Sequence, residues 1–199
     1  MTKANNSKLF KILFLIFFVL MVVFAVNNIW KNRPKNHSAL QLEYLKSVNI
    51  NPFSLYDIEN KENTYLKYIL QKKASKTLVI FWASWCSPCL QEMIDLRELL
   101  EERASSFFSQ KDIIFINVDE GDQEKVLSKT NKITKKYLKN KDVFRKYFDS
   151  KSKLLNALRI SKLPFSMIVN KEGFIENIYY GRLDFNEIHQ KYFMNKTGD

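Results

Sequence analysis

The longest apolar stretch of the chain lies near its start, between residues 12 and 30. Residues 12–26 read ILFLIFFVLMVVFAV, and no charged residue occurs between Lys11 and Lys31. A helix of this length, rising about 1.5 Å per residue, spans roughly 28 Å and so matches a hydrocarbon core of about 30 Å. The run also lacks the polar stripe of a helix that packs on a soluble core. We therefore predict a transmembrane anchor over residues 12–30.

A cleaved signal peptide is the alternative interpretation of this run. Such a peptide usually has a shorter apolar region and ends in small residues at its cleavage site. The exit here reads FAVNNIW, with Phe24 and Val26 where small residues would be required, and no cysteine follows closely that could carry a lipid. We therefore expect the anchor to be retained.

The charges that flank the anchor do not decide its orientation by themselves. Three lysines precede the run and three basic residues follow it within residues 31–35, so the positive-inside rule gives a near tie. A short N-terminal stub before an early span usually stays in the cytoplasm. We expect residues 1–11 to be a cytoplasmic stub, residues 31–50 a polar tether, and residues 51–199 a folded domain outside the cytoplasmic membrane of a bacterial cell.

Beyond residue 51, short apolar runs alternate with segments of helical period. The run KTLVIFWAS, residues 76–84, is rich in branched and aromatic residues and is typical of a buried central strand. From Pro88 to Arg103 apolar residues recur at helical spacing, and the first turn of a helix tolerates a proline. The segments PFSMIVN and FIENIYY, joined by KEG, predict a β-hairpin.

The remaining segments complete an α/β pattern. Asp184 is suited to cap a closing helix, because its carboxylate can accept from free amides of the first turn. This order of strands and helices predicts a central mixed sheet flanked by helices on both faces. The further elements that we predict are a strand at 52–58, a helix at 61–73, a strand at 112–120, a lysine-rich helix at 123–148, a short helix at 153–160 and a helix at 184–195.

Both cysteines of the chain lie at the junction of the predicted central strand and the helix that follows. Cys86 and Cys89 are separated only by Ser87 and Pro88. The first sulfur of such a motif faces free backbone amides and the positive end of the helix dipole, which favour its thiolate. The second lies one turn further along, within reach of a mixed disulfide on the first. The spacing therefore predicts dithiol–disulfide exchange.

Other chemistries fit these residues less well. A zinc site usually needs four ligands, and the two histidines, His37 and His189, are distant in sequence. A purely structural clip over so short a loop would stabilise little. Copper(I) held between two thiolates stays open as an alternative. Nucleophilic catalysis by Ser-His-Asp or Cys-His lacks a suitably placed histidine, and we expect no cofactor and no resident metal.

The net charge of +11 raises the question of nucleic-acid binding. The lysines are scattered among polar residues, most densely over residues 125–146, without an arginine cluster or interleaved aromatic residues. Such a distribution is typical of solvated helices. We therefore expect no nucleic-acid partner.

The residues around the cysteines resemble a known family. LVIFWASWCSPC is similar to the active-site strand and loop of the thioredoxin superfamily, and WCSPCLQEM, with Glu92 three residues after Cys89, is similar to its membrane-anchored, extracytoplasmic TlpA/ResA/CcmG-type branch. The resemblance covers about residues 51–195. Further matches are NPFSLYDIENK, IIFINVDE and LRISKLPFSMIVNKEGFI.

The resemblance implies a thioredoxin-like fold and assigns roles to several residues. It implies a cis peptide between Leu163 and Pro164 facing the disulfide, with the Leu163 backbone free to pair with a strand of the substrate. An ordinary proline at the start of a strand is the alternative for Pro164. By the same resemblance, Trp85 lies beside the sulfurs and offers apolar surface to a target, whereas we expect Trp82 to pack in the core.

Two departures from the family pattern affect these expectations. Thioredoxin has a buried aspartate in the strand before the motif, and Ile80 occupies the matching position here. Proton transfer must therefore come from another group; Glu92 is the candidate, and water or a merely structural surface glutamate are the alternatives. The connection over residues 121–147 is also longer and richer in lysine than is usual in the family, which leaves substrate contacts there undetermined.

The residues and the resemblance together imply a function. We expect a membrane-anchored reductant of protein disulfides, in which the Cys86 thiolate attacks the target and Cys89 resolves the mixed disulfide. By resemblance, the targets are cysteines of apocytochrome c or of a copper-site assembly factor, and the partner that supplies electrons is a membrane dithiol donor. The alternatives are a disulfide-donating oxidant or isomerase, a copper-binding assembly module, and a non-catalytic interaction domain.

Overall fold

The computed structural model describes residues 18–24, 36–72, 75–102, 108, 112–139 and 144–194, which belong to two compact units, residues 1–41 and 42–199. In the first unit, residues 18–24 are helical and exposed. The rest of the predicted anchor, residues 12–17 and 25–30, lies outside the described residues. Within the described part of the chain, we find no helix with the length and apolar character needed to cross a membrane.

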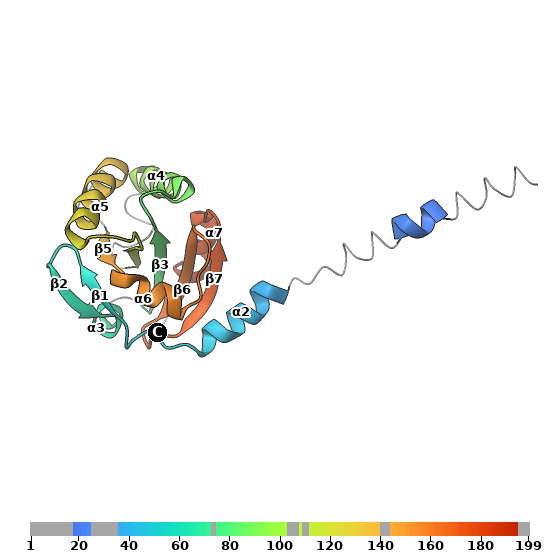
Figure 1. Ribbon diagram of the computed structural model, residues 1–199, viewed down its shortest axis with the longest axis horizontal. Coiled ribbons are helices and arrows are strands. Elements are labelled where there is room, and N and C mark those ends of the chain that lie inside the picture. The colour runs from blue at the N-terminus through green and yellow to red at the C-terminus, as the bar shows by residue number, and fades with distance from the viewer. Residues whose placement is uncertain are drawn as a thin grey trace, which may run out of the picture. The chain divides into compact units, whose positions relative to one another are not determined.

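The second unit is built on a mixed sheet whose strand order is β2-β1-β5-β4-β3-β6-β7 (Figure 1). β3 pairs in parallel with β4, and β4 with β5, while the other pairings are antiparallel. The strands are β1 Ser54–Asp57, β2 Glu62–Tyr65, β3 Lys76–Trp82, β4 Ile113–Asn117, β5 Arg145–Phe148, β6 Phe165–Asn170 and β7 Ile175–Tyr180.

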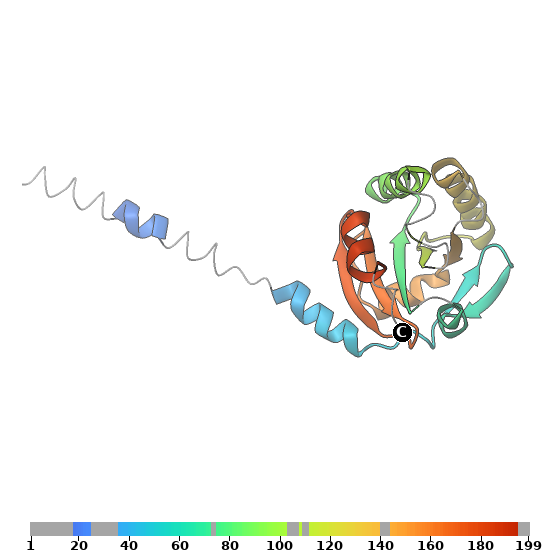
Figure 2. The ribbon, with the colours of Figure 1, turned by 180° about the vertical axis from the view of Figure 1, so that it is seen from behind.

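Helices flank this sheet, as the sequence predicted (Figure 1 and Figure 2). Asp184 caps α7 by accepting from the amides of Asn186 and Glu187, at 3.0 and 3.1 Å. The helices are α2 Asn36–Ser47, α3 Leu66–Gln71, α4 Ser87–Glu102, α5 Gln123–Leu138, α6 Lys153–Ala157 and α7 Phe185–Tyr192, and a 3₁₀ turn covers Ser150–Ser152.

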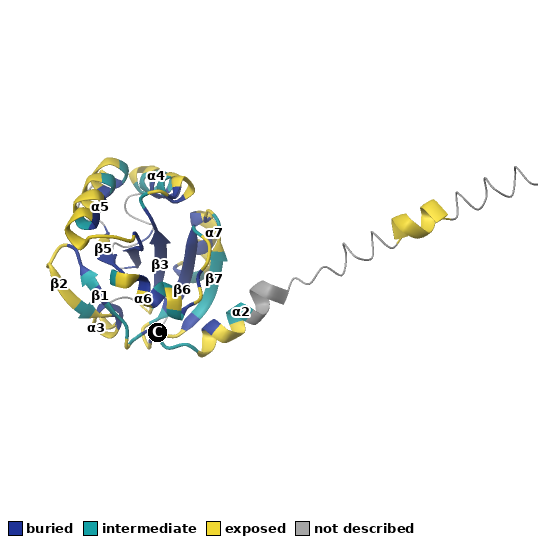
Figure 3. Cartoon of the chain, viewed as in Figure 1, coloured by how far each residue is buried: buried dark blue, intermediate teal, exposed yellow. Residues whose placement is uncertain are grey.

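The centre of the sheet is buried, which confirms the predicted role of the apolar run at 76–84. β3 is buried from Thr77 to Trp82, and every residue of β4 is buried (Figure 3). Trp82 is 1% exposed and belongs to the core, as expected. Because neither face of these strands meets water, β3 provides a fixed base for the loop that follows it.

Two segments predicted as helices each contain a strand. Residues 61–73 form β2 before the short helix α3, and residues 123–148 form α5 and then β5. β2 has the sequence ENTY and is largely exposed at the edge of the sheet, so it shows no apolar alternation. β5 has only four residues, RKYF, a sequence too short to predict a strand by itself. Its pairing with β4 and β1 stabilises the extended conformation.

The boundary of the folded unit lies earlier than the expected position at residue 51. Residues 36–47 form α2, and the second compact unit begins at Leu42. Leu45 and Ile50 are completely buried in the main core cluster. Tyr44 also donates from its hydroxyl to the carbonyl of Ala157, at 3.2 Å. The sequence of this segment is mixed and only weakly periodic, so it did not predict these contacts with the core.

The burial of Leu45 predicts a measurable contribution of α2 to stability. Leu45→Ala should lower the free energy of unfolding by about 2–5 kcal/mol, because the core loses apolar contacts and retains a cavity. Lys46→Ala, at an exposed position of the same helix, should change it by less than about 0.5 kcal/mol. Urea denaturation followed by tryptophan fluorescence measures both. Equal effects of the two substitutions would contradict the packing of α2 described here.

Candidate active site at the end of strand β3

The two cysteines form a disulfide where β3 passes into α4. Cys86 immediately precedes the helix and Cys89 lies in its first turn, with their Cα atoms 5.3 Å apart. The amide of Cys89 donates to the sulfur of Cys86 at 3.3 Å. Cys86 is 4% exposed and Cys89 is 1% exposed. The helix start therefore supplies a donor to the first sulfur, which would stabilise a thiolate there once the disulfide is reduced.

The Leu163–Pro164 peptide is cis, which confirms the expectation from the sequence. β6 begins directly after Pro164, and its first residue, Phe165, is opposite Phe81 in β3. Pro164 therefore lies at the same end of the sheet as the disulfide. Within the described residues, the backbone of Leu163 takes part in no hydrogen bond, so its peptide groups are available to another strand.

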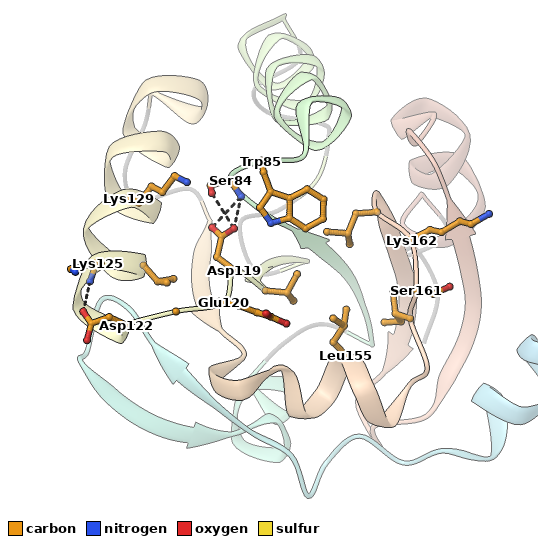
Figure 4. A pocket seen from close by; sticks show the side chains of 15 residues that line it. Ser84, Trp85, Asp119, Glu120, Asp122, Lys125, Lys129, Leu155, Ser161 and Lys162 are labelled. Atoms are coloured by element: carbon orange, nitrogen blue, oxygen red, sulfur yellow. Dashed lines mark hydrogen bonds between the residues drawn. The ribbon is translucent and has the colours of Figure 1, made fainter.

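Trp85 is the most exposed large residue near the disulfide. Its side chain is 69% exposed, although it directly precedes the nearly buried Cys86. Trp85 and Leu163 both line a cavity of about 590 Å³. Figure 4 shows the indole above this cavity, with Leu155 among the residues of the opposite wall. An apolar, accessible ring thus belongs to the residue directly before Cys86.

Glu92 is buried one helical turn after Cys89. Its side chain is 1% exposed, and one carboxylate oxygen accepts from the amide of Leu183 at 2.9 Å. The other oxygen, Oε2, has no hydrogen-bond partner in the described part of the molecule. Burial raises the pKa of Glu92 to about 7, and the nearby Asp95 adds to this rise, while the Leu183 amide and Arg182 oppose it. Glu92 can therefore gain or lose a proton near neutral pH.

A short segment between β7 and α7, residues 181–183, joins Glu92 to the cis-proline loop; we call it the strap. The amide of Gly181 donates to the carbonyl of Pro164 at 2.9 Å, and the amide of Leu183 donates to Glu92. Gly181 has φ of +83°, a backbone conformation that favours glycine. The strap therefore brings the predicted residues Pro164 and Glu92 into one connected site.

Asp119 also belongs to this site, although the sequence did not single it out. It follows β4 and is 6% exposed. Its carboxylate accepts from the amide of Ser84 at 3.0 and 3.1 Å and from the Ser84 hydroxyl at 3.0 Å (Figure 4). Asn117 donates to the same carboxylate at 3.0 Å. Asp119 thereby holds the loop in which Trp85 precedes Cys86. The signal available in the sequence was an acid two residues after the buried run that forms β4.

The structure thus gathers all six predicted site residues at one end of the sheet. Cys89 and Glu92 lie in the first turns of α4, Trp85 and Cys86 in the loop that precedes it, and Leu163 and Pro164 in the loop before β6. Ile80 is buried within β3, so this strand contributes no acid, and the buried acids of the site, Glu92 and Asp119, come from α4 and from the segment after β4. Among the described residues, no group of three or more His, Cys, Asp or Glu side chains could hold a metal ion.

The buried carboxylate predicts a specific dependence of stability on pH. The Glu92 pKa is about 7 in the folded protein against 4.5 in the unfolded chain, so the folded state binds the proton more tightly. The contribution of this proton to the free energy of unfolding is fully present below pH 4.5 and is lost as the pH rises through about 7. The total loss is on the order of 3 kcal/mol. Urea unfolding of the disulfide form at several pH values measures this loss.

Glu92→Gln should remove that dependence, because the amide does not titrate. Glu98→Gln, on the same helix but with a side chain 57% exposed, should retain it. If wild type and Glu92→Gln changed in parallel with pH, Glu92 would not be the titrating group.

Comparison with known proteins agrees with this geometry. The model of a family described as thioredoxin-like matches residues 75–175, about half of the chain. Sporulation thiol-disulfide oxidoreductase A of Bacillus subtilis (strain 168) is 25% identical over 122 residues, which are 61% of this chain and 68% of that protein. Thiol-disulfide oxidoreductase ResA of Geobacillus thermodenitrificans (strain NG80-2) is 23% identical over 138 residues, 69% of this chain and 71% of that one.

A solved structure shows the same fold. The exposed lipoprotein thioredoxin of Streptococcus pneumoniae strain TIGR4 superimposes with a TM-score of 0.51 at 22% identity, covering 69% of this chain and 95% of that one. The family match spans β3, the disulfide, Glu92 and the cis-proline loop. The chain therefore belongs to the thioredoxin-like family, within which it is a thiol–disulfide oxidoreductase similar to ResA.

Proposed function

We propose that this protein reduces disulfides of other proteins outside the cytoplasm, held at the membrane by residues 12–30. The observation that carries the proposal is the Cys86–Cys89 disulfide at the start of α4, on the same end of the sheet as the cis Leu163–Pro164 peptide. A dithiol at this position can exchange with a disulfide of a bound polypeptide. The carboxylate of Glu92, which accepts a hydrogen bond from the strap, adds a group that can transfer a proton.

In the first step, the thiolate of reduced Cys86 attacks one sulfur of the target disulfide. The sulfur–sulfur bond of the target breaks as the bond to Cys86 forms, and the other target sulfur leaves as a thiolate. The Cys89 amide, which donates to the Cys86 sulfur at 3.3 Å, supports the attacking thiolate. The product is a mixed disulfide between Cys86 and the target.

In the second step, Cys89 attacks the sulfur of Cys86 and releases the target. Before it can attack, the Cys89 thiol must lose its proton, and Glu92 lies one turn away on the same helix. With a pKa of about 7, the ionised carboxylate can accept this proton at neutral pH and pass it to a departing target thiolate. Two electrons have then moved to the target, and the protein holds the Cys86–Cys89 disulfide.

The loop before β6 provides the docking edge for the target. The backbone of Leu163 is available for pairing with an extended strand, in the manner of β-augmentation. The exposed indole of Trp85 lines the cavity and offers apolar surface to the residues beside the target cysteine. Backbone pairing of this kind accepts many sequences, so it suits a protein that acts on polypeptide targets.

The chemistry of the motif favours a reductant. The residues between the cysteines, Ser87 and Pro88, carry no positive charge that would further stabilise the thiolate and so the reduced form. A reductant must be reduced again after each turnover, which requires a dithiol donor in the same membrane. Relatives named thiol-disulfide oxidoreductase support the general activity. We propose cysteines of apocytochrome c or of a copper-site assembly factor as the targets.

Trapping of the mixed disulfide tests this proposal. Cys89→Ala should accumulate target proteins bound to Cys86, because the resolving thiol is missing. Non-reducing electrophoresis and mass spectrometry of cells that express the variant identify the bound partners. Cys86→Ala is the matched control and should trap far fewer partners, since its remaining thiol is only 1% exposed.

A second measurement gives the direction of electron flow. The reduction potential of the Cys86–Cys89 pair should be closer to about −270 mV, as in thioredoxin, than to about −120 mV, as in a strong oxidant. A reduction potential near about −120 mV would contradict the proposed reductant and indicate a protein that donates its disulfide. If Cys89→Ala trapped nothing and the purified wild type reduced no protein disulfide, the exchange function itself would be rejected.

A further inference from the structure

Within the described residues, the strap makes three polar contacts, one from each of its residues, and the Leu183 side chain belongs to the main core cluster. Gly181 donates from its amide to the carbonyl of Pro164, and Leu183 donates from its amide to Glu92, each at 2.9 Å. Between them, the guanidinium of Arg182 pairs with the carboxylate of Asp95. The two outer contacts reach residues of the proposed site, whereas the middle contact is an ion pair to a residue outside it.

The position of Asp95 makes this ion pair relevant to Glu92. Asp95 follows Glu92 by three residues on α4, and side chains at this spacing lie on the same face of a helix. The ion pair therefore fixes the strap to the face of α4 that carries Glu92. Leu183 is the next residue after Arg182, so the bond from its amide to Glu92 depends on where the strap is held.

The groups that act electrically on Glu92 come from two elements. Asp95 on α4 raises its pKa and Arg182 in the strap lowers it, after the larger effects of burial and of the Leu183 amide. In the disulfide form, Cys86 and Cys89 carry no charge. The direct influence of Asp95 and Arg182 on Glu92 is therefore one of charge, and an influence through the position of the strap would be separable from it.

We propose that Arg182 and Asp95 are positioning residues whose ion pair clamps the strap against α4 and so keeps the Leu183 amide on the Glu92 carboxylate. The importance of the clamp for disulfide exchange rests on the proposed function, in which Glu92 accepts the proton of Cys89. The clamp itself is a property of the disulfide form and can be measured without any target.

The clamp and a simple charge effect predict different results for a double variant. Arg182→Met combined with Asp95→Asn removes both charges, whose direct effects on Glu92 are opposite, with that of Asp95 the larger. If the pair acted through charge alone, the double variant would therefore have a Glu92 pKa at or slightly below that of the wild type. Under the clamp proposal, the released strap withdraws the Leu183 amide, which normally stabilises the ionised carboxylate, so the pKa must rise.

Titration of Glu92 in the full-length disulfide form tests this prediction directly. The carboxyl carbon is followed by NMR in protein labelled with ¹³C at glutamate, and Glu92→Gln assigns its signal. We expect a higher pKa in the Arg182→Met variant and also in the double variant. We expect a value at or below that of the wild type for Asp95→Arg with Arg182→Asp, which restores the pair in the opposite sense and places a positive charge at position 95, the position with the stronger direct effect on Glu92.

Glu102→Gln, an exposed charge change on the same helix, is the control and should leave the pKa unaltered. A Glu92 pKa at or below the wild-type value in the double variant would overturn the clamp and leave only direct charge effects. A pKa that stays above the wild-type value in the reversed pair would also overturn it, because a clamp requires the pair and not a particular residue at each end.

A kinetic measurement tests the consequence for exchange. Reduced protein is mixed with dithiobis(nitrobenzoate); attack by Cys86 breaks the disulfide of the reagent, leaves one half on Cys86 and releases a first coloured thionitrobenzoate. Attack by Cys89 on this mixed disulfide then releases the second, and the rate of this second release is the one measured. At pH 7 the release should be about fivefold slower in the double variant, the change in ionised fraction that a rise of about one unit in the pKa gives. If the NMR titration shifts and this rate does not, the clamp stands and the proposed role of Glu92 is wrong.

Discussion

The pairing of β3 with β4 on one side and β6 on the other is the constraint on which the site depends. β3 is buried along almost its whole length and ends just before the disulfide. β4 runs parallel to it and therefore places Asp119 beside the same end, while β6 runs antiparallel and begins there with Pro164 before it. Residues from three distant segments thus meet because one central strand fixes both neighbours.

The buried carboxylate nearest to the disulfide in sequence, Glu92, belongs to α4 and not to the central strand. Ile80 occupies the position within β3 where thioredoxin places its acid, so the strand itself contributes only apolar packing. The buried Glu92 comes from α4 and accepts a single hydrogen bond, from the Leu183 amide, within the described structure. Burying a charge with so few donors is costly, and this cost makes the carboxylate a proton acceptor at neutral pH.

The sequence predicted those parts of the molecule whose information is local. The apolar run of β3, the paired cysteines, the hairpin of β6 and β7 and the cap at Asp184 are each contained within a few neighbouring residues. β2 and β5 were missed because their strand character comes from their partners. The bonds from Ser84 to Asp119 and from Leu183 to Glu92 join residues 35 and 91 positions apart, a relation that no local pattern contains.

The bonds between Asp119 and Ser84 have a consequence for how partners are told apart. They hold the loop before Cys86 through a backbone amide and a hydroxyl, and neither bond involves a sulfur atom. Opening or closing the disulfide therefore leaves this support of Trp85 in place. Under the proposed function, an electron donor and a target would then meet the same indole surface, so they would have to dock in alternation, selected by the oxidation state of their own thiols and not by a change of shape.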